Sequence, residues 1–197
     1  MNLPNKLTVI RILLVPILVL VWLFPYSSFG FNLISLEFGY FSLPLLNLIL
    51  LFIFVIASIT DFLDGNIARK NNMVTTFGKF ADPIADKLLV NTMLIILTFK
   101  HVIPVIPVIL MLGRDTIVDC CRMLASQNGV VVSAGMLGKT KTVLQMFAII
   151  CILLNNLPFE MIGIPVSDIL LWTASFVSVA SGYSYFMQLK EYIFESM

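Results

Sequence analysis

Four aspartates are the residues of this chain whose type and spacing point most directly to chemistry: Asp61, Asp64, Asp82 and Asp86. The first two are three positions apart and the last two are four positions apart, so each pair would project from one face of a helix. An ionised carboxylate near hydrocarbon is costly and is rarely left unpaired. Because four converging carboxylates would repel one another, we expect a bound cation to neutralise them.

The ligand types favour a hard divalent cation. Residues 61–86 contain no histidine or cysteine, which argues against zinc and for Mg²⁺ or Mn²⁺. Such ions are usually held by carboxylates together with waters and substrate phosphates. Two ions about 3.5–4 Å apart could clamp the attacking and leaving oxygens of a phosphoryl transfer. The stretch therefore predicts two Mg²⁺ or Mn²⁺ ions as cofactors.

Small residues lie among the four carboxylates. Gly65, Ala68 and Gly78 leave space where a ligand could lie against the backbone. Close packing of membrane helices uses small residues in the same way. Taken one at a time, these residues are compatible with either role.

The elements that must position these side chains are membrane helices. Of the 197 residues, 59% are hydrophobic and 12% are charged, whereas soluble domains are roughly half apolar and a quarter charged. The net charge of +1 gives no reason to expect a nucleic-acid partner. The three cysteines are odd in number and lie in apolar segments, so no disulfide framework is expected.

The apolar segments predict an all-α, polytopic bundle of six transmembrane helices that forms a single domain, residues 1–197. Lengths near 20 residues suit a hydrocarbon core of about 30 Å. Residues 1–11 are predicted as an interfacial segment, the aromatic-rich stretch 25–43 as a loop, and Pro83 as part of a helical first turn. The predicted spans are residues 12–24, 44–68, 82–99, 104–125, 139–154 and 166–189.

The basic residues predict the orientation of the bundle. With six spans, both termini lie on one side, and Lys100 alone among the twelve basic residues falls on the other side. Because positive charge favours the cytosolic side, both termini and the acidic stretch are expected there. The basic residues on that side are Lys6, Arg11, Arg69, Lys70, Lys79, Lys87, Arg114, Arg122, Lys139, Lys141 and Lys190.

The acidic stretch also resembles the signature of a known family, the CDP-alcohol phosphatidyltransferases. Every spacing of that signature is kept in Asp61-x2-Asp64-Gly65-x2-Ala68-Arg69-x8-Gly78-x3-Asp82-x3-Asp86. The resemblance implies a homodimeric enzyme of the cell membrane, with its active site facing the cytoplasm. Such an enzyme transfers a phosphatidyl group from CDP-diacylglycerol to an alcohol and releases CMP.

The resemblance also implies roles for the signature residues. All four aspartates would bind the metal ions, and Asp86 would in addition take the proton from the attacking hydroxyl. The cytidine diphosphate site would be formed by Asp61, Gly65, Ala68, Arg69, Gly78 and Asp82. Asn5 and Arg11 are candidates to cover the nucleotide or to support its neighbours.

Further stretches are similar to the bacterial members of the family that use glycerol 3-phosphate as acceptor. They are residues 2–11, 79–87, 113–115 and 138–142, and with the signature they cover most of residues 1–145. The chain departs from the family pattern at Asp115, where glutamate is usual, and at Asp119, where an uncharged residue is usual. The resemblance thus implies glycerol 3-phosphate as the second substrate.

A doubly charged acceptor phosphate requires several cations near the cytosolic face. Arg114, Lys139 and Lys141 are the residues that we expect to bind it. For Arg122, substrate contact and pairing with Asp119 at i,i+3 are both open.

Two alternatives to this function have different consequences. A cardiolipin synthase of the same family would use phosphatidylglycerol as acceptor, and other members use other alcohols. A divalent-cation transporter would line an ion path with acids near the middle of the membrane or on both sides. The clustering of the four aspartates at one end of their helices favours an enzyme.

Overall fold

The computed structural model describes residues 2–31, 34–38, 41–70, 75–127 and 135–195; for some of these, including 61–70 and 191–195, it describes the backbone alone. The chain divides into two compact units, and each is described by itself below. The first unit contains residues 1–96 and 153–155, and the second contains residues 97–152 and 156–197.

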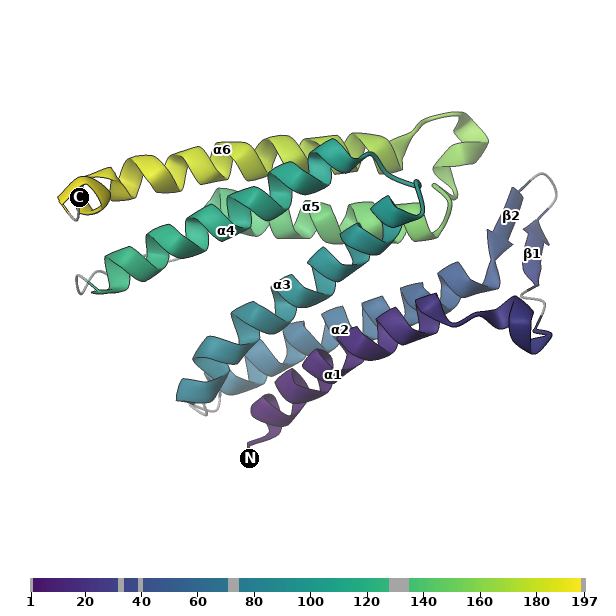
Figure 1. Ribbon diagram of the computed structural model, residues 1–197, viewed down its shortest axis with the longest axis horizontal. Coiled ribbons are helices and arrows are strands. Elements are labelled where there is room, and N and C mark those ends of the chain that lie inside the picture. Colours follow the sequence, from purple (N-terminus) through teal and green to yellow (C-terminus); the bar gives the residue numbers. More distant parts are fainter. Residues whose placement is uncertain (1, 32–33, 39–40, 71–74, 128–134, 196–197) are drawn as a thin grey trace. The chain divides into compact units, whose positions relative to one another are not determined.

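The first unit is built on two helices that pack side by side, α1 (Leu3–Leu23) and α2 (Leu45–Lys70) (Figure 1). Between them lie the short 3-10 helix η1 (Tyr26–Phe29) and an antiparallel hairpin of β1 (Ser35–Phe38) and β2 (Phe41–Pro44). Helix α3 (Thr76–Phe99) follows, and its residues up to Ile96 belong to this unit. The sequence predicted residues 25–43 as a loop without strands. That prediction was wrong, because the segment contains η1 and most of the β1–β2 hairpin.

The N-terminal residues belong to the first helix. The sequence predicted an interfacial segment up to residue 11 and a span from residue 12, whereas α1 is one continuous helix from Leu3. Pro4 lies at its start, where the missing backbone donor costs least. This continuity places Asn5, Thr8 and Arg11 at successive turns of the same helix.

Helix α3 begins earlier than the sequence predicted. Pro83 was expected in its first turn, but the helix starts at Thr76 and Pro83 lies inside it. Thr75 explains the earlier start, because its hydroxyl accepts a hydrogen bond from the backbone N–H of Gly78 at 3.0 Å. This is the ordinary N-cap contact, which satisfies a donor that the first helical turn leaves open.

The second unit holds three long helices, α4 (Val105–Gln127), α5 (Met136–Leu153) and α6 (Val166–Glu195), with the 3-10 helix η2 (Phe159–Ile162) before α6. Helices α4 and α6 pack along each other (Figure 1). The buried residues of α6 recur every three or four positions and form one stripe. They are Leu171, Ala174, Ser175, Ser178, Ser181, Tyr185 and Leu189.

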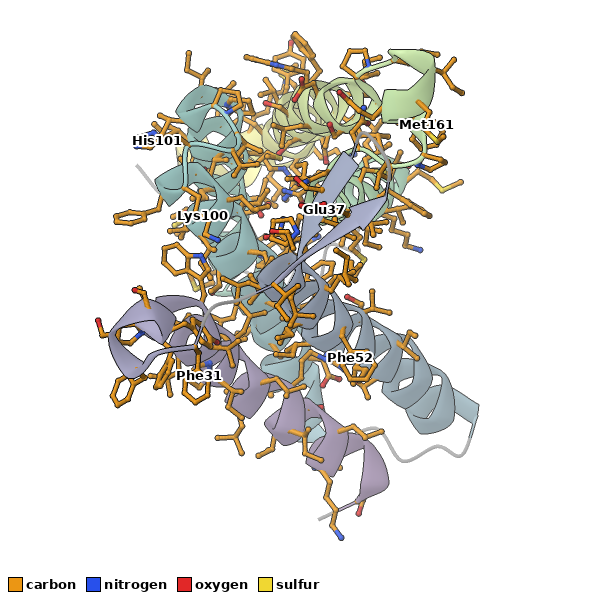
Figure 2. The ribbon with its side chains drawn as sticks, turned by 90° about the vertical axis from the view of Figure 1, so that its right-hand side faces the viewer. Phe31, Glu37, Phe52, Lys100, His101 and Met161 are labelled. Carbon is orange, nitrogen blue, oxygen red and sulfur yellow. The ribbon has the colours of Figure 1, made fainter. Side chains whose placement is uncertain are left out.

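The described part of the chain contains six α-helices, as the sequence predicted, and three of them are long and apolar enough to cross a membrane. Those three stretches are Asn5–Leu23, Met136–Leu153 and Val166–Lys190. Large apolar side chains are also widely exposed, for example Phe52 on α2 at 67% and Met161 on η2 at 70% (Figure 2). Exposed apolar surface of this extent is unusual for a soluble monomer and indicates a membrane protein.

Candidate functional site

A line of polar side chains on α1 is buried in the first unit. Asn5 is 8% exposed, Thr8 is 1% exposed and Arg11 is fully buried. Polar groups are rarely buried without a partner, and here one partner lies on α3. The hydroxyl of Thr8 donates a hydrogen bond to Oδ1 of Asp82 at 2.6 Å. The N-terminal helix therefore fixes the orientation of one of the predicted metal ligands.

Gly78 lies in the same polar neighbourhood. The hydroxyl of Thr75 donates to Oδ1 of Asn5 at 2.9 Å, while it accepts from the N–H of Gly78. A Cβ placed on Gly78 would lie 3.3 Å from Oδ1 of Asn5 and 3.6 Å from Oδ2 of Asp82. Residue 78 is thus small because polar groups surround it closely, and helix packing alone does not account for it.

Two of the four predicted metal ligands have described side chains. Asp82 and Asp86 are one turn apart on α3, and both are half-buried. Among the side chains that the structure describes, no three His, Cys, Asp or Glu residues lie close enough to hold a metal. That statement does not cover Asp61 and Asp64, the other two predicted ligands, because the structure describes only their backbone. The donors that are described, carboxylates supported by a hydroxyl, fit Mg²⁺ or Mn²⁺.

The end of α2 carries the other signature residues of the predicted cytidine diphosphate site. Its last turns include Gly65, Ala68 and Arg69. Their side-chain placement lies outside the described residues, so their predicted role stays a prediction.

In the second unit, Asp115 lies between two basic residues. Nζ of Lys141 is 2.5 Å from both carboxylate oxygens, and Nη1 of Arg114 is 2.9 Å from Oδ1. Asp115 is 6% exposed and Lys141 is 3% exposed. A buried carboxylate and ammonium stabilise each other only as a pair, because each charge alone would have lost its hydration. Two of the residues predicted to bind the acceptor phosphate are therefore held by one aspartate.

Lys139 differs from Lys141. Lys139 is exposed on α5, whereas Lys141 is buried. Two positions along a helix turn the side chain to nearly the opposite face. Of the three predicted phosphate-binding residues, the structure brings together Arg114 and Lys141, but not Lys139.

Tyr185 of α6 connects both arginines of α4. Its hydroxyl accepts a hydrogen bond from Nη2 of Arg122 at 2.6 Å and another from the N–H of Gly135 at 2.7 Å. The guanidinium carbons of Arg114 and Arg122 lie 5.6 and 4.8 Å from the centre of its ring. Both distances are within the range of cation–π attraction.

Arg114 is also fixed by two small residues of α6. Its Nη2 donates a hydrogen bond to the hydroxyl of Ser181. Its Cγ would lie 2.8 Å from a Cβ placed on Gly182, so a larger residue there would displace the arginine. Arg114 borders a largely apolar groove of about 420 Å³ between α4 and α6, which leaves one side of the residue accessible.

Several of these residues were not found from the sequence, among them Thr8, Ser181 and Tyr185. Thr8 had a usable signal, since it lies three positions from both Asn5 and Arg11. Ser181 and Tyr185 lie in a span whose sequence is distinctive only in being apolar. Their partners on α4 are more than sixty positions away, so no local pattern indicates them.

A family model described as CDP-alcohol phosphatidyltransferase matches residues 1–180 of the chain. A Bacillus subtilis protein named CDP-diacylglycerol–glycerol-3-phosphate 3-phosphatidyltransferase is 46% identical, over 94% of this chain and 93% of its own length. A protein of the same name from Rickettsia bellii is 41% identical, over 97% of this chain and 97% of its own length. Another from Pseudomonas fluorescens is 32% identical, over 79% of this chain and 73% of its own length. The chain belongs to the CDP-alcohol phosphatidyltransferase family.

Proposed function

We propose that this protein transfers the phosphatidyl group of CDP-diacylglycerol to glycerol 3-phosphate, which gives phosphatidylglycerophosphate and CMP. The relatives that match nearly the whole chain carry the name of this activity. The structural observation that carries the proposal is the contact of Thr8 with Asp82, beside Gly78. In this contact, Asp82 and Gly78 of the family signature lie next to Thr8 and Asn5 of the N-terminal helix.

The donor site would hold two Mg²⁺ or Mn²⁺ ions through Asp61, Asp64, Asp82 and Asp86. When bound, these ions would neutralise the pyrophosphate oxygens of CDP-diacylglycerol. The hydroxyl of Thr8 keeps Asp82 in one orientation. Residues that orient a metal ligand in this way raise the affinity of a site, because the ligand loses less freedom on binding.

The cytidine diphosphate would lie along the end of α2 and the start of α3. Its site comprises Asp61, Gly65, Ala68, Arg69, Gly78 and Asp82. The short distances around Gly78 support this, because the backbone there is approached by polar atoms and not by apolar packing. Asn5, which is buried beside Gly78, would support that part of the site.

Asp86 would act as the general base. It takes the proton from the acceptor hydroxyl as the hydroxyl oxygen bonds to the phosphorus of the phosphatidyl group. The bond from that phosphorus to the bridging oxygen breaks, and CMP leaves with the bridging oxygen and its electron pair. The guanidinium of Arg69 would stabilise the negative charge that develops on the departing phosphate.

The acceptor phosphate would bind in the second unit at Arg114 and Lys141. Asp115 holds both cations, and the three side chains together keep one positive charge in excess. Lys139 is exposed and lies apart from this pair, so its predicted contact with the acceptor phosphate remains a prediction. Arg122, which reaches the same tyrosine as Arg114, would belong to the site as well.

All six helices would cross the cell membrane, with both termini and the active site on the cytoplasmic side, and the protein would act as a homodimer. Three helices that are long and apolar enough to span support this within the described residues. The six predicted spans would also place eleven of the twelve basic residues on the cytoplasmic side, as positive charge favours. A single domain over residues 1–197 remains a prediction. The lipid substrate reaches such a protein directly from the bilayer.

The test is a panel of acceptors with the purified protein in detergent. CDP-diacylglycerol and Mg²⁺ are supplied with glycerol 3-phosphate, phosphatidylglycerol, serine or inositol phosphate, and CMP release is measured. We expect release with glycerol 3-phosphate. Release with phosphatidylglycerol instead would indicate a cardiolipin synthase, and flux of a divalent cation without CMP release would indicate a transporter.

A further inference from the structure

Tyr185 is buried in the second unit, at 3% exposed, and makes an unusual set of contacts with cations. Two guanidiniums share its ring, and its hydroxyl accepts hydrogen bonds from Arg122 and from Gly135. Gly135 immediately precedes α5, the helix that carries Lys141. One side chain of α6 thus connects α4 to the start of α5.

The two arginines have donors that remain unused. The Nε atoms of Arg114 and Arg122 are buried, and neither has a hydrogen-bond partner among the described residues. A buried donor without an acceptor is destabilising, and such groups are uncommon in folded proteins. An oxyanion is the chemical group that would satisfy both the free N–H donors and the positive charge.

The ring of Tyr185 explains how two guanidiniums can be held near each other. Each is attracted to the π-electrons of one ring, so the ring offsets part of their mutual repulsion. The hydroxyl fixes Arg122 further, through a hydrogen bond to Nη2. That bond leaves Nε of Arg122 available to another acceptor.

We propose that Tyr185 is a positioning residue of the acceptor-phosphate site, which holds Arg114 and Arg122 so that their free donors bind the phosphate of the acceptor. This rests on the proposed function, since glycerol 3-phosphate is the acceptor that supplies the phosphate. Tyr185 itself does not touch the substrate. Its effect passes through the two arginines.

The test compares Tyr185→Phe and Tyr185→Leu with the wild type in detergent. The phenylalanine keeps the ring and removes the hydroxyl, and the leucine removes both. We expect the KM for glycerol 3-phosphate to rise by roughly three- to tenfold in Tyr185→Phe and further in Tyr185→Leu. The KM for CDP-diacylglycerol should not change. Tyr183→Phe is the matched control, because Tyr183 is a nearby tyrosine of α6 that is 67% exposed.

A second variant separates positioning from folding. Arg122→Lys keeps the charge and removes the planar group that reaches the tyrosine hydroxyl. If Tyr185 acts through Arg122, the double variant Tyr185→Phe/Arg122→Lys should have the same KM for glycerol 3-phosphate as the worse single variant. If the two single variants each raise the KM for glycerol 3-phosphate and the double variant raises it by the product of the two factors, the proposal would be overturned.

Two other outcomes are decisive. A loss of kcat with both KM values unchanged would mean that Tyr185 only maintains the fold, and would overturn the proposal while the proposed function stands. Wild-type protein that releases no CMP with glycerol 3-phosphate would overturn the proposed function and this inference together.

Discussion

Both carboxylate oxygens of Asp115 accept a hydrogen bond from Nζ of Lys141, each at 2.5 Å, and the two residues are almost completely buried. The pair connects α4 to α5, and Arg114 joins it from the neighbouring position of α4. A buried pair of this kind constrains both partners, since neither charge can be left alone at low cost. It therefore fixes the position of the cations that would bind the acceptor phosphate.

Asp115→Asn should reduce both stability and acceptor binding. Removal of the charge leaves Lys141 buried without its carboxylate, and breaking a buried pair costs about 3–5 kcal/mol. The thermal midpoint in detergent should fall, and the KM for glycerol 3-phosphate should rise. The double variant Asp115→Asn/Lys141→Gln should recover much of the stability but not the KM. Recovery of both would show that Lys141 does not bind the acceptor.

Gly182→Ala should displace Arg114. The new Cβ would lie 2.8 Å from Cγ of Arg114, closer than such atoms approach, so the arginine must move. The KM for glycerol 3-phosphate should rise by roughly threefold or more, as expected for a lost charge-assisted contact. Gly113→Ala is the matched control, because no atom lies within 4 Å of its Cβ position. Equal KM values for the two variants would argue against the role of Arg114.

Thr8→Val should weaken metal binding. The substitution keeps the shape of the side chain and removes the hydroxyl that orients Asp82. Loss of a contact that orients a metal ligand typically costs about tenfold or more in affinity. The Mg²⁺ concentration for half-maximal CMP release should rise accordingly, and Thr8→Ser should behave as the wild type. An unchanged Mg²⁺ dependence in Thr8→Val would show that the contact with Thr8 does not contribute to metal binding by Asp82.

The orientation in the membrane can be tested with single cysteines at Lys100 and Lys190, which are both exposed. We expect a membrane-impermeant maleimide to label Lys100→Cys in intact cells, and Lys190→Cys only after the cells are permeabilised. Labelling of both in intact cells would contradict cytoplasmic termini. The background variant, which must retain CMP release, replaces Cys120, Cys121 and Cys151.

The helices, and the helices on which the signature residues lie, could be predicted from the sequence because both depend on local patterns. Apolar segments of about twenty residues indicated the helices, and the spacing of the aspartates indicated the carboxylate pairs on α2 and α3. The start of α3 was misplaced because Pro83 is a strong signal for a first turn, whereas the cap at Thr75 is a weaker one.

The contacts that connect helices could not be predicted in this way. Asp115 and Lys141 are 26 positions apart, and Arg122 and Tyr185 are 63 positions apart. Such pairs depend on the packing angle and rotation of whole helices, which no local spacing determines. The β-hairpin was missed for a similar reason, since its strands of four residues carry little pattern of their own.

Transfer of radiolabelled glycerol 3-phosphate into lipid is the most direct test of the proposed function. The purified protein is incubated with CDP-diacylglycerol, Mg²⁺ and the labelled acceptor, and both labelled lipid and CMP are quantified. We expect equimolar labelled phosphatidylglycerophosphate and CMP, with neither formed by Asp86→Asn. Release of CMP without label in the lipid, or full activity of Asp86→Asn, would contradict the account.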